Sequence, residues 1–92
     1  MNSGRLEKIG LMEVKKKLAI ELSVEIYGLR EQVNRATDDS RPIADMAFDE
    51  LHVVMQRLQT KTIEHRQLVD ELRRLADDLG LDMPNTDVRR KR

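Results

Sequence analysis

Apolar residues recur every three or four positions along two long stretches of the chain, which is the spacing of one face of an α-helix. The first stretch predicts a helix over about residues 5–36. Its main apolar stripe comprises Leu11, Val14, Leu18, Leu22, Ile26, Leu29, Val33 and Ala36. A second stripe, formed by Ile20, Val24 and Tyr27, lies on another face of the same helix. A helix that is apolar on two sides needs cover from more than one neighbour.

The segment TDDSRP, residues 37–42, interrupts this pattern. Asp and Ser side chains compete with a helix for backbone hydrogen bonds, and the residue before a proline is disfavoured in the helical region. Proline itself suits the first turn of a new helix. We therefore expect a hinge at residues 37–41 and a second helix that begins at about Pro42.

The second helix is expected over about residues 42–79, because an apolar pattern with a seven-residue period continues to that point. Its central column comprises Ala44, Leu51, Leu58, His65, Leu72 and Leu79, with further apolar columns on both sides. The polar segment at residues 59–63 leaves open an alternative, a break that would give a three-helix bundle. Gly80 fits the left-handed residue that ends a helix. Residues 82–92 are predicted to form a flexible basic tail.

These elements predict an all-α fold in which residues 1–81 form one antiparallel helical hairpin. With so short a hinge, residues whose numbers sum to about 79 should face each other. The two helices cannot cover both apolar faces of the first helix by themselves. We therefore expect a homodimeric four-helix bundle. The predicted dimer or partner interface comprises Leu18, Ile20, Val24 and Tyr27.

Composition supports this helical reading and narrows the classes of function. The chain has 92 residues, enough for a single domain, and 37% of them are charged whereas only 2% are aromatic. This mixture favours long solvated helices. Cysteine is absent, which rules out disulfides and thiolate metal sites and fits a cytoplasmic protein. No apolar run approaches the roughly 18 residues of a membrane span, so we expect no membrane partner.

Two basic runs make nucleic-acid binding the alternative function. The formal net charge is zero, but the last four residues are all basic, so that 13 basic residues face 17 acidic residues in the rest of the chain. Basic side chains in such runs contact phosphates electrostatically. The candidate contacts are Lys15, Lys16, Lys17, Arg89, Arg90, Lys91 and Arg92.

The two histidines and the acidic pairs do not indicate a catalytic or metal site. His52 and His65 are thirteen positions apart, which places them on different faces of one helix. The expected register puts His65 opposite about residue 14, within a polar segment of the second helix. We interpret His65 as a half-buried residue that sets the register, with a pH-sensitive contact as the alternative.

The function predicted from these observations is that of a small non-enzymatic protein–protein interaction module. It would act as a homodimer, as a regulator, adaptor or assembly factor, without a cofactor. The surplus of apolar surface on the first helix is the observation behind this prediction.

Overall fold

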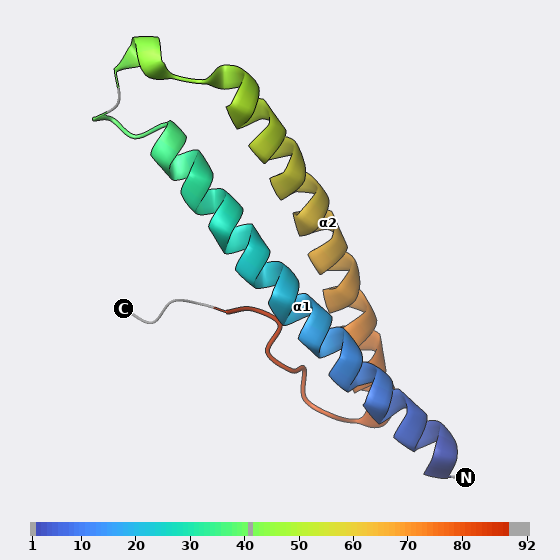
Figure 1. Cartoon of the computed structure of the whole chain (residues 1–92). Helices are drawn as coiled ribbons and strands as arrows, with labels where there is room; N and C mark the ends of the chain where they lie inside the picture. Colours follow the sequence, from blue (N-terminus) through green and yellow to red (C-terminus); the bar gives the residue numbers. More distant parts are fainter. Residues whose placement is uncertain (1, 41, 89–92) are drawn as a thin grey trace.

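The computed structural model describes residues 2–40 and 42–88, and its two long helices pack side by side (Figure 1). Helix α1 spans Asn2–Ala36 and helix α2 spans Phe48–Leu79. A short 3-10 helix, η1, spans Ile43–Asp45 in the connection. The predicted all-α antiparallel hairpin is confirmed.

Helix α2 begins six residues later than predicted, because the backbone around Pro42 does not turn directly into an α-helix. Pro42 has φ −58° and ψ 142°, and Met46 is extended with φ −73° and ψ 117°. Only η1 lies between them. The α-helix starts at Phe48, and two acidic residues, Asp49 and Glu50, occupy its first turn. Negative charge there is favourable because it faces the positive end of the helix dipole.

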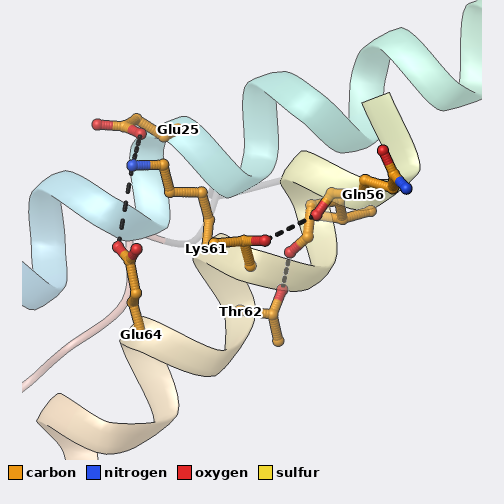
Figure 2. Close-up of polar contacts among 7 residues, drawn as sticks. Glu25, Gln56, Lys61, Thr62 and Glu64 are labelled. Atoms are coloured by element: carbon orange, nitrogen blue, oxygen red, sulfur yellow. Dashed lines mark hydrogen bonds and ion pairs between the residues drawn. The ribbon is translucent and has the colours of Figure 1, made fainter. Parts of the chain in front are cut away.

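Helix α2 is continuous through residues 59–63, so the alternative of a three-helix bundle does not occur. Thr60 and Thr62 donate their hydroxyl hydrogens to backbone carbonyls one turn earlier, at Gln56 (3.1 Å) and Leu58 (2.7 Å). Polar threonines are thereby accommodated without a break in the helix. Figure 2 shows Lys61 of this segment reaching across to α1.

Ion pairs between the helices define a register that differs from the predicted one. Lys8 pairs with Asp78 (3.7 Å), Lys15 with Glu71, and Lys61 with Glu25 (3.4 Å). Partner numbers therefore sum to 86, and the expected sum of 79 is wrong. The cause is the longer connection between the helices, residues 37–47. The difference equals one seven-residue period, so the predicted columns of α2 still face α1.

The buried core lies at the end of the hairpin away from the connection. Its apolar members within the described residues are Met12, Ala19, Leu72, Ala76 and Leu79, with Ile9, Leu68 and Leu75 packed against them. Residues 12, 19 and 23 of α1 point into the interface, and Ser23 is only 2% exposed. Small side chains at positions 19 and 23 let the helices approach closely.

The predicted main stripe of α1 is therefore only partly correct. Leu11, Val14 and Leu18 are 45–56% exposed and flank the interface that they were expected to form. The contact line follows Met12, Ala19 and Ser23 instead, because a leucine on that line would hold the helices further apart. The larger side chains are displaced to its side.

The hairpin is one layer of helices thick. Its principal extents are 65 × 28 × 15 Å, and the smallest is close to the roughly 10–12 Å diameter of one helix with its side chains. Each helix thus has an outward face that no other helix covers within residues 2–40 and 42–88. Among the described residues, no helix is both long and apolar enough to cross a membrane.

Gly80 ends α2 as predicted, with φ 65° and ψ 30° in the left-handed region. The N–H of Leu81 donates to the carbonyl of Ala76 at 2.9 Å, which closes the last turn. Residues 81–88 then run back along the helical pair beside α1 (Figure 1). We call this segment the returning tail. Residues 89–92 lie outside the described part of the chain.

Candidate functional site

The outward face of α1 carries a row of half-exposed apolar side chains, which we call the outward patch. Its members are Leu11 (45% exposed), Val14 (56%), Leu18 (45%) and Val24 (55%). Around an α-helix Leu11, Val14 and Leu18 lie within about 60° of one another, and Val24 lies about 80° beyond Val14, so the four spread over the outward half of α1. An apolar patch on a protein of this size is a typical site of protein association.

Two glycines lie on the same side of α1 as the outward patch. A Cβ atom added to Gly10 or Gly28 would meet no atom within 4 Å. Packing within the described chain therefore does not require glycine at either position, although each glycine costs a helix roughly 1 kcal/mol relative to alanine. Gly28 opens onto a hollow that Leu29, Arg57 and Lys61 also line.

The returning tail covers the opposite flank of α1. The Ser23 hydroxyl donates to the carbonyl of Ile20 (2.7 Å) and accepts the N–H of Val88 (3.0 Å). A buried hydroxyl that uses both its donor and its acceptor capacity fixes the tail at one point along the helix. The prediction of a flexible tail did not anticipate this contact.

His65 holds the returning tail at a second point. Its Nε2 atom lies 2.7 Å from the carbonyl oxygen of Thr86, and since a carbonyl only accepts, Nε2 carries the hydrogen. His65 lines a hollow together with Ser23, Tyr27 and Asp87. The expectation that it lies opposite residue 14 is wrong, because the register is shifted by seven residues.

The structure divides the predicted interface between these two sides of α1. Leu18 and Val24 belong to the outward patch, whereas Ile20 and Tyr27 are half-buried. Tyr27 lines the hollow beside the tail and stacks under Arg30, whose guanidinium carbon is 5.5 Å from the ring centre. Positions 18 and 27 are half a turn apart on a helix, so they cannot join one flat surface.

A groove on the side of α1 away from the tail combines leucines with glutamates. It is lined by Leu18, Glu21, Leu22, Glu25, Glu64, Gln67, Leu68 and Glu71. Lys61 lies between Glu25 (3.4 Å) and Glu64 (3.8 Å), as Figure 2 shows. Lys15 pairs with Glu71. Two lysines thus offset part of the acidic charge and tie the two helices together.

The three lysines predicted to contact nucleic acid do not form one surface. Lys15 is engaged by Glu71, Lys16 is half-buried, and Lys17 is exposed. Consecutive residues on a helix point about 100° apart, so these side chains diverge. The basic residues 89–92 lie outside the described part of the chain. Nucleic-acid binding stays a prediction that no contact supports.

The acidic and histidine side chains of the described residues do not gather into a metal site. His52 is exposed on α2 and far along the helix from His65. Within residues 2–40 and 42–88, no three side chains of the types that ligate metals come close enough to hold an ion. Several charged groups instead form ion pairs between the helices, such as Lys8 with Asp78 (3.7 Å) and Lys61 with Glu25 (3.4 Å).

Substitution of His65 should loosen the returning tail and leave the helices intact. In His65→Leu the carbonyl of Thr86 loses its donor, so we expect faster hydrogen exchange at residues 86–88, with α2 unchanged. His65→Gln, which keeps a donor, is the matched control. Equal exchange rates at residues 86–88 in wild type and His65→Leu would contradict this structural role.

No protein-family model, curated protein or solved structure gives a significant match to this chain. The function must therefore be inferred from the surfaces of this chain. These are the outward patch, the flank of α1 that the returning tail covers, and the groove lined by leucines and glutamates.

Proposed function

We propose that this chain is a small non-enzymatic helical interaction module that acts as a homodimer and binds a protein partner. Regulators, adaptors and assembly factors of the cytoplasm use modules of this kind. The outward patch of Leu11, Val14, Leu18 and Val24 is the observation that carries the proposal.

The energetics favour a second chain as cover for this patch. Only five apolar side chains are buried among the described residues, which is a small core for a domain of this length. Covering the remaining surface of a half-exposed valine or leucine contributes roughly 1 kcal/mol per side chain, about half the value for full burial. In a twofold pair the patch of each chain is covered, so this free energy contributes once for each of the two chains.

Sedimentation equilibrium of the purified chain tests the proposal. We expect a dimer at tens of micromolar, and Val24→Glu should shift it toward monomer because a carboxylate would be buried in the contact. Ile63→Glu is the matched control, since Ile63 is 47% exposed on α2 and lies outside the patch. A folded wild-type monomer at these concentrations would exclude the homodimer.

A further inference from the structure

The residues on the outward face of α1 are arranged symmetrically about Ala19. Identical residues, or residues of opposite charge, lie at equal distances before and after it. Counting from Ala19, which points into the hairpin, Gly10 and Gly28 are both nine positions away. Val14 and Val24 are both five positions away. Lys17 and Glu21 are both two positions away, and they carry opposite charges. The pairs therefore match when the helix is laid against a reversed copy of itself.

We propose that a second copy docks antiparallel on this face, with the twofold axis at the level of Ala19. This inference deepens the proposed homodimer and depends on it. Along an antiparallel helix pair, residue numbers rise in one helix while they fall in the other. The numbers of two residues that face each other therefore always add up to the same value. A sum of 38 sets Val14 against Val24 of the second copy and Lys17 against Glu21 of the second copy.

Charge favours the antiparallel orientation over the parallel one. Neither Lys17 nor Glu21 makes an ion pair with another residue in the described part of the chain. A parallel twofold pair would set each lysine against its equivalent and each glutamate against its equivalent. The antiparallel pair instead forms two opposite-charge contacts, and a C2 interface repeats every favourable contact.

The glycines give this arrangement a steric basis. In the same register, Gly10 meets Gly28 of the second copy at both ends of the contact. The space that each glycine leaves open within one chain then admits the backbone of the other. Glycine at these two positions, which packing inside the chain does not require, is explained by close approach of a second α1.

The orientation is tested by reversing the two charges in the full chain. We expect Lys17→Glu and Glu21→Lys each to raise the dissociation constant roughly tenfold, because each change turns two attractive pairs into repulsive ones. The double variant should return close to the wild-type value. Arg66→Glu, an exposed charge reversal on α2, is the control and should have no effect.

Spin labels measure the orientation independently of the energetics, and the lack of cysteine makes single-site labelling clean. Labels at Glu13→Cys should be separated by about 18 Å along the helix axis and labels at Gln32→Cys by about 39 Å, at 1.5 Å per residue. Equal short distances at both sites would overturn the antiparallel arrangement while leaving the dimer in place. A monomeric wild-type chain would remove the proposed function and this inference together.

Discussion

Leu72→Ala is expected to destabilise the hairpin by about 2–5 kcal/mol. Leu72 is fully buried and is the largest side chain with no exposed surface among the described residues. Truncating its isobutyl side chain to a methyl group leaves a cavity between α1 and α2, because Met12 and Ala76 are held by their own helices. A total stability of 5–15 kcal/mol is typical of domains, so the fraction lost is large.

Urea denaturation followed by circular dichroism measures this loss, with protein concentration held fixed because dimerisation adds to stability. Leu81→Ala is the matched control, since Leu81 is 43% exposed beyond the end of α2. We expect the control to cost less than about 1 kcal/mol. Equal losses in the two variants would mean that the core is not centred on Leu72.

The periodic pattern predicted the helical hairpin and the columns of α2 that face α1, because one helix face is encoded in consecutive local spacings. It did not predict the register. The number of residues in the connection depends on where α2 begins, and the extended backbone at Pro42 and Met46 delayed that start by six residues. A column that repeats every seven residues tolerates such a shift, so the pattern cannot detect it.

The inner face of α1 was harder to predict because small residues form it. Ala19 and Ser23 do not stand out in a hydrophobic pattern, whereas Leu11 and Leu18 do. The returning tail was missed for a related reason. One anchor is the hydrogen bond that Ser23 accepts from the N–H of Val88, 65 residues away. The other is the bond that His65 donates to the carbonyl of Thr86, 21 residues away, and local spacing does not encode contacts at such distances.

The pattern predicted neither the inner face of α1 nor the returning tail, and for this reason the predicted interface residues lie on two different sides of the helix. Ile20 and Tyr27 were expected to need a second chain, and the returning tail of the same chain now lies on their side of α1. Leu18 was expected in both the core stripe and the interface, and it is half-exposed. The apolar surface that is left for a second chain to cover therefore lies on the outward face of α1 and not on the side where the tail lies.

Ala19→Leu is expected to destabilise the hairpin by about 1–3 kcal/mol, although it makes the sequence more hydrophobic. Ala19 has no exposed surface and belongs to the same buried cluster as Leu72. Three further methylene-sized groups there would push α1 away from α2 and strain the nearby ion pair of Lys15 with Glu71. Denaturation in urea at fixed protein concentration again gives the measurement.

Asn34→Leu is the control for Ala19→Leu, because Asn34 is exposed near the end of α1 and leucine has the higher helix propensity. We expect the control to be neutral or slightly stabilising. A stabilising Ala19→Leu would mean that α1 turns its leucine stripe toward α2, as the pattern alone suggested. Leu18 and Leu11 would then lie in the core, and the outward patch that supports dimerisation would not exist. The same substitution therefore tests the helix contact and the surface on which the proposed function depends.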